Sequence, residues 1–467
     1  MARQSATRLQ LSGHRFLLRR MAHALVRGDA RMLDDPLRAQ AVAYGAGCVL
    51  AAVAIAVGAV LALARPGSAP GDAPILMARD TGALYVRIDD TVHPVPNLVS
   101  ARLIVGTPAD PVAVDDAVIT RFRRGPLVGI PGAPVQIGRP LSLDESGWEI
   151  CDLAEAAETV LVAGRADRET PQLRAGHGLL VSARAVGAAT YLLTDGWRAR
   201  VDLRDIAVVR ALHLEGVPVQ PVSQALLDAV PEAPALQVPL IAGVGAAGPA
   251  ALGGLTVGTV VRVARAGPAE FYVVLADGLQ RIGRVAADVI RFSVTQSDDQ
   301  PPVVPADMVA DVPVADSLAV ARFPERVLPR GRSVVCARWD PRQPGTDTNT
   351  AVAVADSLPV DTVALAQADG VGPNIDRVHI PVGRSALLEA GGLVRGATVG
   401  GPLYLLNDLG VLFGIRDAET AEHLGLGKRV VPAPWPMLAM LPRGPELNRD
   451  AASVVRDVVP GIGAAPA

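Results

Sequence analysis

Two side chains with distinctive chemistry are rare in this 467-residue chain. They are cysteine, which can form a cross-link, and lysine, which can hold a phosphate group. Cys48 lies in an apolar stretch, while Cys151 and Cys336 lie far apart in the sequence. Their spacing excludes a zinc ribbon, and no histidine cluster lies beside them in the sequence to complete a metal site. The chemistry left for Cys151 and Cys336 is a disulfide, or else two free buried thiols.

The single lysine, Lys428, would have to serve any P-loop in this chain. A P-loop reads G-x-x-x-x-G-K-[ST], because backbone N–H groups cradle the phosphates, lysine adds charge and the hydroxyl binds magnesium. Arg429 stands at the Ser/Thr position, and Glu422 stands at the first glycine. The sequence also contains no G-x-S-x-G elbow and no H-E-x-x-H motif. We therefore expect no Walker A site, no catalytic residue and no bound metal.

Four segments share a pattern in which an apolar run is followed by Asp, by Gly within two residues and by a second apolar run. They are residues 75–88, 191–201, 272–282 and 403–415, with the pairs Asp80 and Gly82, Asp195 and Gly196, Asp277 and Gly278, and Asp408 and Gly410. This pattern predicts β-hairpins in which glycine supplies a positive φ. An aspartate in such a turn usually bonds the nearby backbone, and metal or sugar binding is the alternative role.

The second and fourth segments also match further along the chain. The spacing from Asp195 to Pro221 equals that from Asp408 to Pro434, at 26 residues. Apolar stretches follow, ALLDAVPEAPAL and MLAMLPRGPEL, and each ends in Φ-P-x-x-P-x-L, where Φ is an apolar residue. The first segment has a weaker counterpart in VPNLVSARL (95–103), and the third is the most degenerate. We read these as four hairpin-plus-helix repeats that pack against their neighbours and present surfaces.

Two stretches interrupt the repeats, residues 126–185 and 300–395, and each contains one of the separated cysteines. Their Val-rich segments 159–164 and 333–339 are typical of strands. The two stretches are predicted to form one central β domain. The expected organisation is 1–38 amphipathic region, 39–64 transmembrane helix, 65–74 linker, 75–125 repeat 1, 126–185 central domain, 186–240 repeat 2, 241–299 repeat 3, 300–395 central domain again, and 396–467 repeat 4 with the C-terminus.

Residues 39–64 contain no charged side chain. As a helix they would be roughly 39 Å long, enough to cross a hydrocarbon core of roughly 30 Å. A signal peptide would be shorter and nearer the start. Arginines crowd the residues before the span and are scarce just after it, so the N-terminus is expected in the cytoplasm and the rest outside. That oxidising location favours the Cys151–Cys336 disulfide, whose long loop would contribute about 4–5 kcal/mol.

Residues 14–33 carry apolar side chains interleaved with arginines, which predicts a basic amphipathic helix ended near Gly28. Such a helix could lie on anionic lipid or dock onto a partner protein. The net charge of −3 gives no case for nucleic-acid binding. Aromatic residues make up only 3% of the chain, which argues against a sugar-stacking surface.

Three stretches resemble one family: GHRFLLRRMAHALVRGDARMLDDPLR (13–38), PVPNLVSARLIVG (94–106) and PAPWPMLAMLPRGPEL (432–447). They are similar to EccB, a core membrane component of the ESX, or type VII, secretion systems of actinobacteria. The cysteine pair matches this family too. The resemblance implies assembly with further EccB copies, with EccD and EccE, and with EccC, the FtsK/SpoIIIE-type ATPase. It favours docking for the cytoplasmic helix, through Phe16, Leu17, Arg19, Arg20, Met21 and Leu25.

The expected fold is therefore a single-span membrane protein with a cytoplasmic amphipathic helix and a large, mainly-β extracytoplasmic region of four repeats around a central β domain. The expected function is a structural subunit whose outer region oligomerises and helps to form or stabilise an export path. ATP hydrolysis is the alternative, because members of the family are often called ATPases, and ATP would then be the one cofactor. A module that binds the cell envelope is a weaker alternative.

Overall fold

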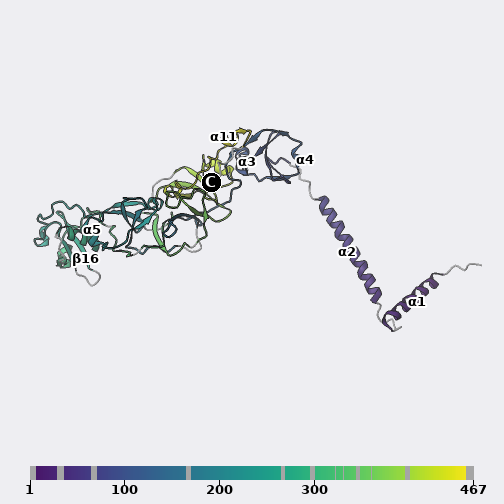
Figure 1. Cartoon of the computed structure of the whole chain (residues 1–467), viewed down its shortest axis with the longest axis horizontal. Coiled ribbons are helices and arrows are strands. Elements are labelled where there is room, and N and C mark those ends of the chain that lie inside the picture. The colour runs from purple at the N-terminus through teal and green to yellow at the C-terminus, as the bar shows by residue number, and fades with distance from the viewer. Residues whose placement is uncertain are drawn as a thin grey trace, which may run out of the picture. The chain divides into compact units, whose positions relative to one another are not determined.

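The computed structural model describes residues 7–28, 36–64, 71–164, 170–263, 269–294, 300–320, 322–329, 331–342, 348–358, 360–394 and 400–458. The chain divides into two compact units, Met1–Ala69 and Pro70–Ala467. The first unit is helical and the second is built mainly of strands (Figure 1).

The first unit consists of two helices, α1 (Arg8–Arg27) and α2 (Pro36–Ala64). Helix α1 begins earlier than the predicted residue 14, because the Thr7 N–H donates to Gln10 Oε1 at 3.0 Å and so starts the first turn. It ends as predicted at Gly28, whose φ of 69° lets its N–H bond the Ala24 carbonyl. Residues 29–33 of the predicted helix lie outside the described residues.

Helix α2 contains the predicted transmembrane segment. Its stretch Ala39–Val60 is long and apolar enough to cross a membrane, and none of it is buried against the rest of the chain. An apolar helix with no protein cover is the form expected of a segment that lipid surrounds. The predicted linker 65–74 is described only from residue 71 onward.

All four repeats of the second unit share one connectivity. Three antiparallel strands form a meander, a helix leads to a fourth strand parallel to the first, and a second helix leads to a fifth segment parallel to the third strand. Repeat 1 consists of β1 (Ile75–Ala78), β2 (Leu84–Ile88), β3 (Thr91–Val95), α3 (Leu98–Val105), β4 (Val112–Val114), α4 (Asp116–Ile119) and β5 (Arg123–Arg124). Repeat 2 consists of β10 (His177–Ala183), β11 (Thr190–Thr194), β12 (Trp197–Val201), α5 (Ile206–Ala211), β13 (Gln220–Val222), α6 (Gln224–Asp228) and β14 (Glu232–Leu236).

The third and fourth repeats end in isolated bridges rather than a full fifth strand. Repeat 3 consists of β15 (Val260–Val263), β16 (Glu270–Val274), β17 (Leu279–Ile282), α7 (Arg284–Val294), β18 (Val303–Val304) and α8 (Ala306–Ala310). Repeat 4 consists of β24 (Arg384–Gly391), β25 (Leu403–Leu406), β26 (Leu412–Ile415), α9 (Ala418–His423), β27 (Val431–Pro434) and α10 (Trp435–Leu438). Parallel bridges from Leu279 to Val314, and from Leu412 to Arg443, mark the fifth segments.

A separate six-stranded sheet joins the two interrupting stretches. In spatial order it contains β21 (Thr350–Ala355), β20 (Val334–Trp339), β8 (Trp148–Leu153), β9 (Glu158–Ala163), β23 (Arg377–His379) and β22 (Val363–Ala364). Both faces of β8, β9 and β20 are buried, one under each of two apolar clusters. Burial on both sides explains why β9 and β20 read as Val-rich runs rather than as alternating patterns.

The remaining elements tie the sheets together. Strand β7 (Arg139–Pro140) pairs with β24, β19 (Arg326–Val327) pairs with β10, and β28 (Val455–Arg456) pairs with β6 (Leu127–Val128). A 3-10 turn covers Ala250–Leu252, and helix α11 (Arg449–Ala452) packs on α3 near the C-terminus (Figure 1).

The predicted boundaries differ from this sheet membership at three places. Strands β10, β18 and β24 lie in the ranges predicted for the central domain, but each of them pairs within a repeat. Helix α8, which follows β18, lies in the same predicted range. For β10 and β24 the reason is that the Asp-Gly signal of repeats 2 and 4 marks the second turn of the meander, so the first strand lies before it. For β18 and α8 the reason is that repeat 3 continues past residue 299. In repeat 1 the Asp-Gly signal marks the first turn instead, between β1 and β2.

The apolar cores show which repeats contact the central sheet. Repeats 2 and 4 share one buried cluster with it, to which α6 contributes Leu226 and α10 contributes Leu438. Repeat 1 shares a cluster with repeat 4, and repeat 2 shares one with helix α7 of repeat 3. Repeats 2 and 4 therefore hold the central sheet, and repeats 1 and 3 attach to them.

Candidate functional site

The predicted cysteine pair is disulfide-bonded in the structure. Cys151 on β8 and Cys336 on β20 are directly opposed in the antiparallel ladder, with their Cα atoms 4.0 Å apart. Both residues are fully buried. Because both sulfurs are in the S–S bond, the nearby grouping with Glu149 cannot act as a thiolate metal site. The Glu149 carboxylate instead accepts hydrogen bonds from Arg338 and from Thr170 Oγ1.

Buried carboxylates connect the central sheet to its surroundings. Asp152 on β8 accepts from the backbone N–H of Ser223, which begins helix α6 of repeat 2, and from Thr159 Oγ1 at 3.1 Å. Burial raises the pKa of Asp152, and these hydrogen bonds and the charge of Arg184, 3.6 Å away, oppose that rise. Asp376 accepts three backbone N–H groups, including that of Thr159 at 2.7 Å.

The turn aspartates of repeats 2 and 4 have the same contact. Asp195 accepts from the Gly176 N–H at 3.1 Å, and Asp408 accepts from the Gly383 N–H at 2.9 Å. In each repeat that glycine directly precedes the first strand of the meander. Each carboxylate thus connects the second turn to the start of its own repeat, which is the backbone role expected of a turn aspartate.

The turn glycines of the same two repeats lie against the central sheet. Gly196 has a φ of 77°, and a side chain on it would collide with the Thr350 carbonyl on β21. Gly410 has a φ of 81°, and an added Cβ would lie 3.0 Å from both methyl groups of Val378 on β23. The two turns are therefore docked on the central sheet where only hydrogen fits. We call them the docked turns.

The turn residues of repeats 1 and 3 behave differently. Gly82 has the predicted positive φ of 70°, but nothing lies within 4 Å of the position that a Cβ would take. Gly278 does not have the predicted positive φ, and glycine is required there because a Cβ would strike the Pro313 carbonyl of the same repeat. Among the described residues, Asp80 and Asp277 make no side-chain hydrogen bond.

The duplicated Φ-P-x-x-P-x-L motif has one structural role. Its first proline offers a carbonyl to the start of the third strand, with Pro231 accepting from the Arg198 N–H at 2.9 Å and Pro442 from the Leu412 N–H at 2.9 Å. Pro313 does the same for Leu279 in repeat 3, at 2.8 Å. Proline suits this edge because its missing N–H faces no partner strand. The motif is thus the fifth, edge segment of the repeat.

The residues predicted for partner docking lie on α1. Phe16 and Leu17 are each 55% exposed, Met21 is 57% exposed and Leu25 is 86% exposed within this chain. Arg19 and Arg20 are also exposed. A 20-residue helix with this much uncovered apolar surface is the kind of element that another protein or a lipid surface covers.

The surroundings of Lys428 do not form a P-loop. A P-loop joins a strand to the start of a helix, whereas Lys428 lies between the end of α9 and the start of β27. Its side chain is 82% exposed, and its Nζ lies 3.3 Å from a carboxylate oxygen of Glu422.

Sequence reasoning missed one cluster, an arginine-rich cavity between repeats 2 and 3. Its lining residues come from widely separated segments, 174–177, 262, 269–291, 300–301 and 325–326. The arginines among them lie in separate stretches of the sequence, so only the fold shows that they gather.

The whole chain matches known proteins. Residues 3–461 match the family described as "Type VII secretion system ESX-1, transport TM domain B", EccB. The chain belongs to the EccB family. It is 36% identical to the ESX-3 secretion system ATPase EccB3 of Mycolicibacterium smegmatis over 97% of this chain and 91% of that protein. It is 35% identical to the ESX-1 secretion system ATPase EccB1 of the same species, over 97% and 96%.

Solved EccB-containing structures share the fold. A chain of an intact ESX-5 inner membrane complex matches all of this chain and 98% of its own length, with a TM-score of 0.71 and 30% identity. A chain of the EccB3 dimer from the ESX-3 core complex matches 82% of this chain and all of its own length, with a TM-score of 0.70 and 33% identity. The fold class expected from the sequence, a single-span, mainly-β EccB protein, is therefore confirmed.

Proposed function

We propose that this chain is a structural subunit of the inner-membrane complex of a type VII secretion system. The observation that carries the proposal is the full-length match to a chain of an intact ESX-5 inner membrane complex. The structure agrees with a structural role, because the second unit is a set of sheets held by a disulfide, buried carboxylates and docked turns. The extracytoplasmic region of the chain oligomerises with other copies of the protein and helps to form or stabilise the export path.

The proposal includes an orientation, with the N-terminus in the cytoplasm and Pro70–Ala467 outside. Arginines before α2 support it. Two single-cysteine reporters in a Cys48→Ser background test it, Ser12→Cys and Thr81→Cys, labelled with a membrane-impermeant maleimide on spheroplasts. Labelling of Thr81→Cys alone is expected. Labelling of Ser12→Cys alone would reverse the orientation.

The proposal also assigns partners: further EccB copies, EccC, EccD and EccE. Helix α1 docks onto their cytoplasmic parts through Phe16, Leu17, Arg19, Arg20, Met21 and Leu25. The double variant Phe16→Asp, Leu17→Asp puts two negative charges into that contact. The amount of partner protein that co-purifies with the tagged chain is expected to fall at least tenfold. The matched variant Ser12→Ala with Arg15→Ala on the same helix is expected to leave recovery unchanged. Equal recovery with both variants would remove α1 from the interface.

ATP hydrolysis is the second candidate, because the two relatives are named ATPases. The surroundings of Lys428 give it no support. Purified chain free of other ATPases is expected to show no magnesium-dependent turnover above that of a mock purification. Turnover that follows the chain through two separate columns and disappears in a point variant would establish the enzyme instead.

A further inference from the structure

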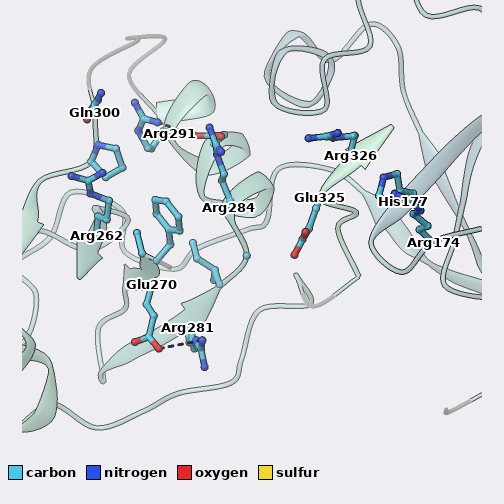
Figure 2. Close-up of a pocket in the computed structure, with 16 residues that line it drawn as sticks. Arg174, His177, Arg262, Glu270, Arg281, Arg284, Arg291, Gln300, Glu325 and Arg326 are labelled. Carbon is cyan, nitrogen blue, oxygen red and sulfur yellow. Dashed lines mark hydrogen bonds and ion pairs between the residues drawn. The ribbon is translucent and has the colours of Figure 1, made fainter. Parts of the chain in front are cut away.

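A cavity with a volume of about 930 Å³ lies between repeats 2 and 3 of the second unit. On the side of repeat 2 the lining comes from the loop before β10 and from strand β19, which pairs with β10, and repeat 3 contributes β15, β16, β17 and α7. Figure 2 shows arginines from both repeats around this space. Cavities of this size accommodate a ligand much larger than a single phosphate ion.

The cavity lining carries an excess of positive charge. Its arginines are Arg174, Arg262, Arg281, Arg284, Arg291 and Arg326, and its carboxylates are Glu270, Asp288 and Glu325. The described lining thus has three more positive than negative groups, in a chain whose overall charge is −3. Like charges gathered at one site repel one another unless an anion joins them, so the concentration of charge points to a negatively charged ligand.

Ion pairs account for only part of this charge. Arg281 pairs with Glu270 at 3.2 Å, and Arg291 pairs with Asp288 at 2.9 Å. In the part of the chain that the structure describes, no ion pair forms to the other four arginines. The Nε–H of Arg262 is buried and has no hydrogen-bond acceptor. A buried donor without an acceptor costs about 1–3 kcal/mol, and Arg262 lines the cavity.

Helix α7 adds a second source of positive potential. It runs for 11 residues from Arg284, and Ile282, Gly283 and Arg284 at its start all line the cavity. Gly283 has no side chain with which to cap the helix, and the first turn contains no acidic residue. The N–H groups of an uncapped first turn and the helix dipole both favour an anion at this end.

We propose that this cavity binds an anion carrying two or more phosphate groups. Arg262, Arg284 and the α7 N-terminus on the side of repeat 3, and Arg174 and Arg326 on the side of repeat 2, supply donors from opposite walls. Guanidinium groups pair with phosphate oxygens in bidentate fashion, and separate walls suit separate phosphates. The ligand would hold repeats 2 and 3 together by bridging them. Both a free polyphosphate and a phosphodiester polymer of the cell envelope have this chemistry.

Calorimetric titration of the full-length chain in detergent with sodium tripolyphosphate tests the proposal. The variant Arg284→Gln with Arg326→Gln removes one exposed arginine from each wall, and it is expected to weaken binding at least tenfold. Arg200→Gln, an exposed arginine lining a different cavity of repeat 2, is the matched control and is expected to change affinity less than twofold. Unchanged melting temperatures verify that the variants fold.

Three results would overturn the proposal: no saturable binding, equal weakening by Arg200→Gln, or binding of citrate as tight as that of tripolyphosphate. A parallel titration with a glycerol phosphate oligomer distinguishes a free polyphosphate from a phosphodiester polymer of the cell envelope. Tighter binding of the oligomer per phosphate group would assign an envelope polymer, and tighter binding of tripolyphosphate would assign a free polyphosphate. In either case Arg262→Gln, which removes the buried Nε–H donor, is expected to weaken the same ligand.

Discussion

Four Asp-Gly turns look alike in the sequence, but the two docked turns differ from the other two in what they contact. In repeats 2 and 4, the aspartate bonds the backbone before the first strand and the glycine lies on the central sheet. In repeats 1 and 3, the glycine faces open space or its own repeat. The shared signal therefore marks a hairpin turn, the first of the meander in repeat 1 and the second in the other repeats. Within the described residues, only in repeats 2 and 4, which flank the central sheet, does that turn contact the sheet.

This difference also shows how the second unit is organised. Repeats 2 and 4 place their second helices, α6 and α10, in one core with the central sheet, and those two helices contact each other. The second helix of repeat 1, α4, buries no residue. One repeated unit thus serves in two ways, as a clamp on the central sheet and as an outer module attached to that clamp.

Loss of the disulfide should have the largest effect, because it cross-links the sheet on which both docked turns lie. In the chain-entropy model a closed loop with a separation of 185 residues contributes about 5 kcal/mol. The variant Cys151→Ala with Cys336→Ala should therefore lose up to that much in the free energy of unfolding, measured with urea in detergent. Cys48→Ala is the matched control, since Cys48 is free and should change little. Equal stability of the two variants would show that the cross-link is dispensable.

Alanine at a docked turn should cost more than alanine at the open turn of repeat 1. Gly196→Ala meets both a positive φ and the Thr350 carbonyl, so we expect a loss of about 3 kcal/mol or more. Gly82→Ala meets only the positive φ, and we expect a loss of about 1 kcal/mol. Urea midpoints of the two variants provide the comparison. Similar losses would mean that the docked turn is not held against β21.

The turn aspartates should follow the same division with smaller effects. Asp408→Ala removes the hydrogen bond to the Gly383 N–H and should cost about 1 kcal/mol. Asp277→Ala removes no side-chain hydrogen bond within the described residues and should change the free energy of unfolding by less than about 0.5 kcal/mol. Asp408→Asn should recover part of the loss, since its amide oxygen can still accept. A loss at Asp277 as large as that at Asp408 would contradict the division.

The smallest effect should appear as a pH dependence at the start of repeat 4. Hydrogen bonds from the Arg384 guanidinium and from the Ser142 backbone N–H lower the pKa of Glu145 to about 2, from an ordinary value of 4.5. Since the pKa is lower in the folded state, the stabilisation is complete above about pH 4.5 and is lost as the pH falls toward 2. Glu145→Gln should therefore show a shallower decline of the urea midpoint between pH 5 and pH 3. Identical slopes for variant and parent would remove Glu145 as a contributor.

The sequence predicted the elements whose signals are local. The charge-free run before residue 65 indicated α2, the Val-rich runs indicated β9 and β20, and the spacing from Asp195 and Asp408 matched repeats 2 and 4. First strands were misplaced because nothing local distinguishes β10 or β24 from strands of the central sheet. The arginine-rich cavity could not be predicted, because packing of repeat 3 on repeat 2 brings Arg326 and Arg284 to one space.

Extraction of the tagged, full-length chain from its native membrane in mild detergent, followed by sizing and mass spectrometry, tests the central claim most directly. A structural subunit should elute in a megadalton-scale assembly together with an FtsK/SpoIIIE-type ATPase and further copies of itself. Any ATPase activity of that fraction should remain with the partner when the two are separated. Elution of the chain alone, from membranes that secrete type VII substrates, would contradict the account.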